Sequence, residues 1–167
     1  MLVTRAQIAG LIPHGEPMCL LDGVLQWDAS RIVCVSRNHR AADNPMRANG
    51  RLPAVCGVEY AAQAMAVHGG LAGNFVRKPR AGYLASVRDV ECMRDRLDDL
   101  DGDLVVEAER LAGDGAHVIY RFRLRVGEIE VLSGQALVAL NTLTPAPLPG
   151  GEGRLEIPFS PREKGMG

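Results

Sequence analysis

The chain has 167 residues, of which 47% are hydrophobic and 23% charged, so it is long enough for one domain with a core of ordinary size. Nineteen Lys and Arg side chains stand against twenty Asp and Glu side chains, which gives a net charge of −1. This balance argues against a protein that neutralises nucleic-acid phosphates, and an aromatic content of 4% argues against base stacking. We therefore expect no nucleic-acid partner.

No run of about 18 apolar residues is present, so the sequence predicts no transmembrane helix. The N-terminal segment is interrupted by Pro13 and Pro17 and lacks the apolar core and cleavage site of a signal peptide. The four cysteines are widely spaced, which predicts reduced cysteines in the core and no metal site. We expect a cytoplasmic protein that has no membrane partner and needs no metal or other cofactor.

The first predicted element is a strand over residues 31–36, and a helix follows over Cys56–Gly73. Ala, Met and Gln in the second segment favour helix. Pro53 can start this helix, and a group of glycines can stop it. Its side chains are small and apolar nearly all round, which predicts a helix buried inside the domain rather than lying on its surface.

The remainder of the domain is predicted to be β-structure. Tyr83–Cys92 has the composition of a strand. In His117–Val126 five apolar side chains alternate with mostly basic ones, which predicts one buried and one basic face. An Asp-Gly turn signal joins this strand to Leu104–Arg110 in a hairpin, and Ile129–Leu140 adds a further strand. One buried helix and a long antiparallel sheet predict an α+β protein whose sheet wraps the helix, the arrangement of a hotdog fold.

The composition changes near Asn141. Five of the ten prolines lie beyond this residue, together with a Gly-Gly-Glu-Gly run. Such a segment has little apolar surface to bury and cannot propagate a helix. We expect a folded domain over residues 1–141 and a tail over residues 142–167.

Glu59 is an acidic residue in the first turn of the predicted apolar helix. A lone carboxylate is unfavourable there unless it is compensated. Gln63 is four residues further on, so the two side chains share one helix face. The helix dipole favours the ionised carboxylate and burial favours the neutral one, which suits a general acid or base. The alternative is a water-exposed acid of the kind common in first turns.

Three blocks of the sequence resemble the β-hydroxyacyl-acyl-carrier-protein dehydratases of fatty acid synthesis, which are hotdog proteins. The blocks are LIPHGEPMCLLD over residues 11–22, EYAAQA over residues 59–64, and a third block that runs from GYLASV at residue 82 to DGD at residue 103. They follow the family's order and lie within a resemblance that spans roughly residues 8–140. The resemblance implies dehydration of acyl thioesters bound to an acyl carrier protein, in fatty acid, polyene or polyketide synthesis.

The resemblance also implies roles for individual residues. In this family a histidine removes the α-proton of the 3-hydroxyacyl chain, and the helix carboxylate helps to expel the hydroxyl as water. Glu59 and Gln63 match the family's helix carboxylate and glutamine and are the expected catalytic residues. A backbone amide near the helix start polarises the thioester carbonyl. The expected substrate-binding residues are Arg51, Pro53, Gly57 and Val58.

The family carries its histidine in a Gly-His-Phe-Pro element, and the similar element here is Gly50-Arg51-Leu52-Pro53. Arg51 stands at the histidine position, and its guanidinium stays protonated at neutral pH and cannot act as a base. By position, His39 is the candidate among the four histidines. The resemblance gives His14 a structural role, whereas His68 points away from Glu59 and His117 lies on the basic face of its strand.

Three functions are consistent with these residues. The chain is a dehydratase with altered machinery, a hotdog thioesterase in which Glu59 activates water, or a non-catalytic pseudo-dehydratase subunit that binds acyl chains or stabilises an active partner. The resemblance implies a homodimer or a heterodimer with a related hotdog subunit, which could donate the missing histidine. The carrier protein is acidic in this family, so the outward Arg121, Arg123 and Arg125 either meet it or form a solvated strand face.

Overall fold

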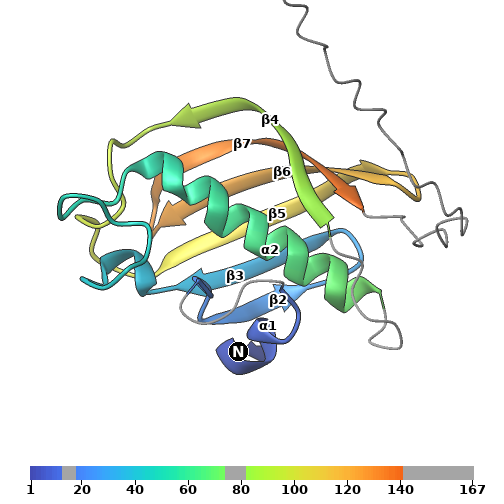
Figure 1. The fold of residues 1–167 in the computed structure, drawn as a ribbon, viewed down its shortest axis with the longest axis horizontal. Coiled ribbons are helices and arrows are strands. Elements are labelled where there is room, and N and C mark those ends of the chain that lie inside the picture. The colour runs from blue at the N-terminus through green and yellow to red at the C-terminus, as the bar shows by residue number, and fades with distance from the viewer. Residues whose placement is uncertain (13–17, 74–81, 141–167) are drawn as a thin grey trace, which may run out of the picture.

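In the computed structural model, which describes residues 1–12, 18–73 and 82–140, a curved sheet wraps around a long helix (Figure 1). The elements are β1 (Val3–Thr4), α1 (Arg5–Ala9), β2 (Gly23–Trp27), β3 (Arg31–Ser36), the 3₁₀ turns η1 (Asn38–Arg40) and η2 (Ala54–Cys56), α2 (Gly57–Ala72), β4 (Gly82–Cys92), β5 (Leu104–Gly113), β6 (His117–Val126) and β7 (Ile129–Leu140). Among the described residues, seven strands form one antiparallel sheet in the order β1-β2-β3-β5-β6-β7-β4. The predicted α+β hotdog architecture is confirmed.

Every strand predicted from the sequence is present. β3, β6 and β7 have the predicted bounds, β4 begins one residue earlier, and β5 extends three residues further. The sequence pattern does not predict β1, α1 or β2. β1 and α1 are two and five residues long, too short for a periodic signal. In β2 a bulge between Val24 and Gln26 interrupts the alternation. The predicted tail lies outside the described residues.

The core lies between α2 and the concave face of the sheet, where α2 contacts β3, β5 and β6. The alternation in β6 places Val118, Tyr120, Phe122, Leu124 and Val126 on the buried face. Each such side chain that leaves water contributes about 1.5–3 kcal/mol to folding. The start of α2 lies very close to this surface, because a Cβ at Gly57 would come within 2.8 Å of both Leu124 Cδ2 and Leu132 Cδ2.

Helix α2 is buried over most of its length, as its composition predicts. Pro53 precedes the 3₁₀ turn η2, which continues directly into α2. The helix runs through Gly69 and Gly70 and ends before Gly73, whose N–H donates to the Gly69 carbonyl at 3.1 Å. No helix within the described ranges has the length and apolar character needed to cross a membrane.

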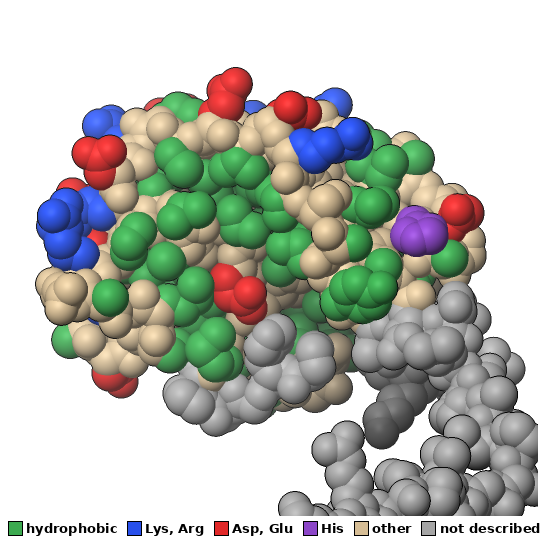
Figure 2. Space-filling view, turned by 45° about the horizontal axis from the view of Figure 1, so that its top comes forward, with side chains coloured by type: hydrophobic (Ala, Val, Ile, Leu, Met, Phe, Trp, Pro, Cys, Tyr) green, Lys and Arg blue, Asp and Glu red, His purple; other side chains and the backbone are tan. Residues whose placement is uncertain are grey.

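Strand β4 forms one edge of the sheet and pairs with β7. All its residues except Val87 are exposed, so α2 leaves this part of the sheet uncovered. Two bulges interrupt its pairing, and Asp89, in the second one, has a positive φ of 51°. The exposed apolar side chains on and beside β4 are Val55, Tyr83, Leu84, Val90 and Met93. Figure 2 shows hydrophobic side chains gathered on one face of the molecule, with an acidic group among them.

Candidate functional site

Glu59 lies in the first turn of α2 and is half-buried. Its carboxyl atom Oε1 accepts a hydrogen bond from Gln63 Nε2 at 3.0 Å. The four-residue spacing therefore brings the two side chains together as predicted. Glu59 is thus a half-buried carboxyl that accepts a hydrogen bond from Gln63, rather than a fully water-exposed acid in the first turn of the helix.

Gln63 is buried, with 1% of its surface exposed, and its amide is bonded on both sides to the N-terminal part of the chain. Gln63 Oε1 accepts from the Leu20 N–H at 2.9 Å, and Gln63 Nε2 donates to the Met18 carbonyl at 2.8 Å as well as to Glu59. Both the oxygen and the nitrogen of this amide are therefore hydrogen-bonded within the protein. Gln63 therefore joins α2 to residues 18–20 and holds the Glu59 carboxyl.

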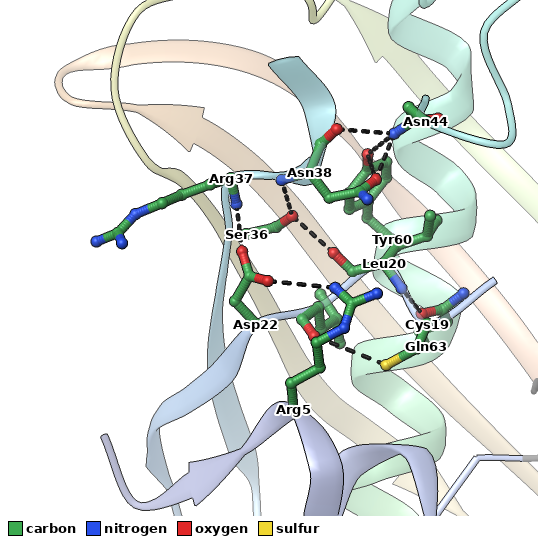
Figure 3. A network of polar contacts seen from close by, with 11 residues as sticks. Arg5, Cys19, Leu20, Asp22, Ser36, Arg37, Asn38, Asn44, Tyr60 and Gln63 are labelled. Carbon is green, nitrogen blue, oxygen red and sulfur yellow. Dashed lines mark hydrogen bonds and ion pairs between the residues drawn. The ribbon is translucent and has the colours of Figure 1, made fainter. Parts of the chain in front are cut away.

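A polar network holds the C-terminal end of the first sequence block (Figure 3). Ser36 Oγ donates to the Leu20 carbonyl at 2.7 Å. Asp22 accepts from the Arg37 N–H at 2.6 Å and from Arg5 Nη1 at 3.3 Å. These contacts attach the Leu-Leu-Asp end of the block to the end of β3, and so hold it beside α2.

The loop ahead of Arg51 is attached to α2 through Tyr60, which is fully buried. The Tyr60 hydroxyl accepts from Asn44 Nδ2 at 2.8 Å and donates to Asn38 Oδ1 at 3.3 Å. Burial raises the pKa of Tyr60, so the hydroxyl stays protonated and can donate. The position that carries histidine in the dehydratases thus follows a rigidly held loop.

Arg51 is exposed and pairs through its backbone with Ala48. Within the described part of the chain its guanidinium has no carboxylate partner. The neighbouring Leu52 N–H donates to Asp98 Oδ1 at 2.8 Å, and Asp98 also binds Arg96 and Arg47. The Arg96 guanidinium holds the pKa of Asp98 well below its usual range. Asp98 therefore fixes the Arg51 loop while the Arg51 side chain stays open to solvent.

Most backbone amides of the turn before Glu59 donate hydrogen bonds to carbonyl groups within the protein. The Ala54 N–H donates to the Asp95 carbonyl and the Cys56 N–H to the Pro53 carbonyl, both at 3.0 Å. The Gly57 N–H donates to the carbonyls of residues 54 and 55. The lack of a side chain at Gly57 allows the helix to pack closely against the sheet. Val58 is partly buried against the core. Among the described residues, no acceptor faces the N–H of Val55, one turn before Glu59. The family resemblance implies a backbone amide near the helix start but does not identify Val55 as the residue that carries it.

None of the three described histidines contacts Glu59. His39 is fully buried with Nε2 3.3 Å from the Leu100 carbonyl, and burial lowers its pKa. His68 is buried between the Tyr120 hydroxyl at 2.9 Å and the Asp28 carbonyl at 2.8 Å. His117 is exposed beside Asp114, as its strand pattern predicts. His39, the candidate by position, therefore faces the core rather than the site. His14 lies outside the described residues.

The outward arginines of β6 are ion-paired with acidic residues of β5. Glu107 accepts from Arg31 Nη2 at 2.6 Å, Arg123 Nη2 at 3.0 Å and Arg125 Nε at 3.3 Å. Burial alone would raise the pKa of Glu107, but the hydrogen bonds from these arginines outweigh it and lower the pKa. Arg121 pairs with Glu109 in the same way, at 3.3 Å. All three outward arginines of β6 are thus paired with carboxylates of β5, although Glu107 alone accepts from three guanidinium groups.

Comparisons with known proteins agree with this fold. The family model ApeP-like, described as ApeP dehydratase, matches residues 6–146. The dehydratase heterocomplex ApeI:P from Xenorhabdus doucetiae has a chain that is 20% identical, with a TM-score of 0.71 over 80% of this chain and 90% of that chain. No curated protein sequence matched.

Two further solved structures share the fold at lower sequence identity. A mutant of thioesterase PA1618 from Pseudomonas aeruginosa is 13% identical, with a TM-score of 0.59 over 84% of this chain and 95% of that chain. The PaaI protein of the E. coli phenylacetic acid degradation operon is 11% identical, with a TM-score of 0.57 over 81% of this chain and 88% of that chain. Fold and site therefore define a hotdog protein with a carboxyl at the start of its central helix. The chain belongs to the ApeP-like dehydratase family, and the predicted resemblance to hotdog dehydratases is confirmed.

Proposed function

We propose that this chain is the carboxyl-bearing subunit of a dehydratase for 3-hydroxyacyl thioesters on an acyl carrier protein, and that a second hotdog subunit supplies the base. One observation carries the proposal. Glu59 lies at the start of α2 with Gln63 beside it, whereas His39, His68 and His117 are bonded or exposed elsewhere. The similar Xenorhabdus chain is part of a dehydratase heterocomplex, which supports a pair of unlike subunits.

The chemistry needs one acid and one base. The partner's base removes the α-proton, and the electrons of that C–H bond form the C=C bond as the C3–O bond breaks. Glu59, protonated at the start, gives its proton to the departing hydroxyl, which leaves as water. The product is the enoyl thioester, and proton exchange with solvent restores both groups. The half-buried position of Glu59 at the start of α2, with Gln63 beside it, supports this role.

The N-terminal end of α2 supplies the groups for the thioester. The Val55 N–H is one turn ahead of Glu59 and can donate to the thioester carbonyl as negative charge develops there. Pro53 and Gly57 shape this turn, and Val58 adds an apolar wall. Arg51 is exposed nearby and can pair with the phosphate of the carrier's prosthetic arm. In this proposal Arg51 binds substrate rather than replacing the histidine.

The partner subunit is proposed to bind along β4. The strand has 11 residues, and its edge opposite β7 is unpaired among the described strands. Exposed Tyr83, Leu84 and Val90 lie on this strand, and Val55 places the same apolar surface next to the start of α2. A subunit that continues the sheet here would cover these side chains and bring its own residues toward Glu59.

The test measures enoyl product from a 3-hydroxyacyl thioester with the chain alone and after co-expression with an ApeI-type hotdog subunit. We expect the pair to turn over substrate and the Glu59→Gln pair to be at least about 100-fold slower. The control Glu128→Gln, at the exposed β6–β7 turn, should keep the wild-type rate. Each of the variants His14→Gln, His39→Gln, His68→Gln and His117→Gln should keep activity in the pair.

Two results would overturn the proposal. Turnover by the isolated chain that one of the histidine variants abolishes would place the base in this chain. Release of free thiol without enoyl product, lost in Glu59→Gln, would make the protein a thioesterase. The interface is checked by Val90→Glu in β4, which should leave the two subunits separate in sedimentation, whereas Leu111→Glu on β5 should not.

A further inference from the structure

The sheet carries charges of opposite sign on two neighbouring strands. The even-numbered side chains of β6 pack in the core, so its arginines lie on the opposite side of the sheet, which we call the outer face. On this face the hairpin register places Arg123 opposite Glu107 and Arg121 opposite Glu109. The acidic side chains therefore lie on β5, and the basic ones lie directly beside them on β6.

The strands on either side complete two rows that cross the outer face. The register gives these rows the order Arg31, Glu109, Arg121, Gln135 and the order Val33, Glu107, Arg123, Ser133. A second copy, turned about a two-fold axis that runs parallel to the strands between β5 and β6, presents each row in reverse order. Arginine then faces glutamate in the middle of each row, and Arg31 faces the uncharged amide of Gln135. The two rows are thus complementary to themselves and oppose no like charges.

The middle of the outer face is hollowed and accessible. A hollow of about 440 Å³ is lined by the four charged side chains of β5 and β6, together with Arg31 and Ser133. The side chains of Arg121 and Glu109 are 60% and 52% exposed. Within the described part of the chain, Arg121 donates only through Nη1 and Arg123 only through Nη2. Because a guanidinium has several N–H donors, both arginines can bind a further carboxylate.

We propose that the outer face of β5 and β6 binds the same face of a second copy of this chain about this two-fold axis. In such an interface each contact occurs twice, so every Arg–Glu match is repeated. Stacked sheets lie about 10 Å apart with their strands within about 30°, a distance that long side chains from both copies can bridge. A partner with one sign of charge would oppose like charges on one of the two strands, whereas a second copy matches both.

This interface is independent of the proposed function. The outer face lies on the side of the sheet away from α2, and the interface does not include β4. Two dehydratase pairs could therefore join back to back while their sites stay accessible. Because the contacts are charged and the side chains are exposed, association should be weak and sensitive to salt.

The measurement is sedimentation equilibrium of the full chain with Val90→Glu in β4, which removes a contribution from that strand. We expect the mass to approach that of a dimer at protein concentrations up to about 0.2 mM in about 50 mM salt. In about 500 mM salt, where screening acts over a few ångström, we expect a monomer.

Charge reversal identifies the surface. Glu109→Arg and Arg121→Glu should each weaken self-association at least about tenfold, because each variant opposes like charges across the axis. An equimolar mixture of the two variants should associate, since every arginine of one variant then faces a glutamate of the other. The control Asp43→Arg, at an exposed loop residue, should leave the equilibrium unchanged.

Three results would overturn the proposal. The first is a chain that stays monomeric in about 50 mM salt at these protein concentrations. The second is self-association of the single variants as tight as that of the parent chain. The third is a mixture of the folded variants that does not associate. Where a single variant does not fold, the chain with both Glu109→Arg and Arg121→Glu keeps an ion pair within each copy, and its self-association decides the question.

Discussion

Arg47 Nη2 lies 2.9 Å from Asp98 Oδ2, and the Asp98 side chain is only 2% exposed. Arg47 also donates to the carbonyls of Ala41 and Gly50, at 2.9 Å each. This ion pair therefore joins both ends of the loop that precedes Pro53 to the connection between β4 and β5. A single buried carboxylate therefore connects this loop to the β4–β5 connection, in addition to its attachment to α2 through Tyr60.

Asp98→Ala should therefore lower the stability of the protein more than Asp99→Ala, a substitution of the exposed neighbouring residue. The substitution leaves two guanidinium groups and the Leu52 N–H without their shared acceptor, which we expect to lower the free energy of unfolding by about 3 kcal/mol. Asp99→Ala, which removes an exposed pair with Arg96 at 3.7 Å, should change it by less than about 1 kcal/mol. Urea unfolding of both variants measures the difference, and equal values would contradict this account.

The same carboxylate predicts a dependence of stability on pH. Because the folded-state pKa of Asp98 is lowered, its contribution is fully present above the unfolded value near 4 and is lost as the pH falls toward the lowered pKa. Wild-type protein should therefore lose stability steadily below about pH 4. Asp98→Asn should show a flatter dependence over this range in urea unfolding at stepped pH. If wild type and Asp98→Asn lost stability in parallel as the pH falls, groups other than Asp98 would determine the loss of stability in acid.

Two helix glycines should respond in opposite directions to alanine. In Gly57→Ala the new methyl meets Leu124 and Leu132 at 2.8 Å, so we expect a loss of about 1–3 kcal/mol despite the better helix propensity. At Gly69 a Cβ meets nothing within 4 Å, and Gly69→Ala should gain about 0.5–1 kcal/mol. Thermal unfolding of the two variants checks both signs. A stabilised Gly57→Ala would show that the sheet can move away from the start of α2.

Tyr120→Phe tests the structural role of His68, which is buried outside the candidate site. His68 Nε2 donates to the Asp28 carbonyl, so Nδ1 accepts from the Tyr120 hydroxyl at 2.9 Å, and burial raises the pKa of Tyr120 to about 12. Removing the hydroxyl leaves a buried acceptor without a donor, which should reduce stability by about 1–2 kcal/mol. Tyr83→Phe on exposed β4 should change it by less than about 0.5 kcal/mol. Activity of the subunit pair should be the same for Tyr120→Phe as for wild type.

The elements that the sequence predicts well are those with a long, regular pattern. β6 has five alternating buried side chains, and α2 has sixteen residues of helix-favouring composition. The contact between Glu59 and Gln63 follows from their spacing along one helix. The bonds from Gln63 to Met18 and Leu20 span 45 and 43 residues. They depend on the shape of a non-periodic segment, which no local pattern encodes.

The pairing of the β6 arginines with acidic residues was predictable in principle. The hairpin register pairs Arg123 with Glu107 and Arg121 with Glu109, so opposite charges face one another across two strands. Considering β6 alone gave a basic face, because the pattern of a single strand contains no information about its neighbour. His39 is a similar case, since a polar local sequence did not indicate that its ring packs under the Leu100 carbonyl.

The bulges in β4 also affect how the protein behaves at high concentration. A long exposed edge strand can add copies of itself without limit and so begin fibrous aggregation. In β4, register breaks after Leu84 and after Arg88 leave only short stretches of regular pairing geometry, and the left-handed backbone at Asp89 twists the edge. Restoring a straight edge would therefore favour insoluble, open-ended assembly. The irregular backbone protects the chain whenever this edge is uncovered.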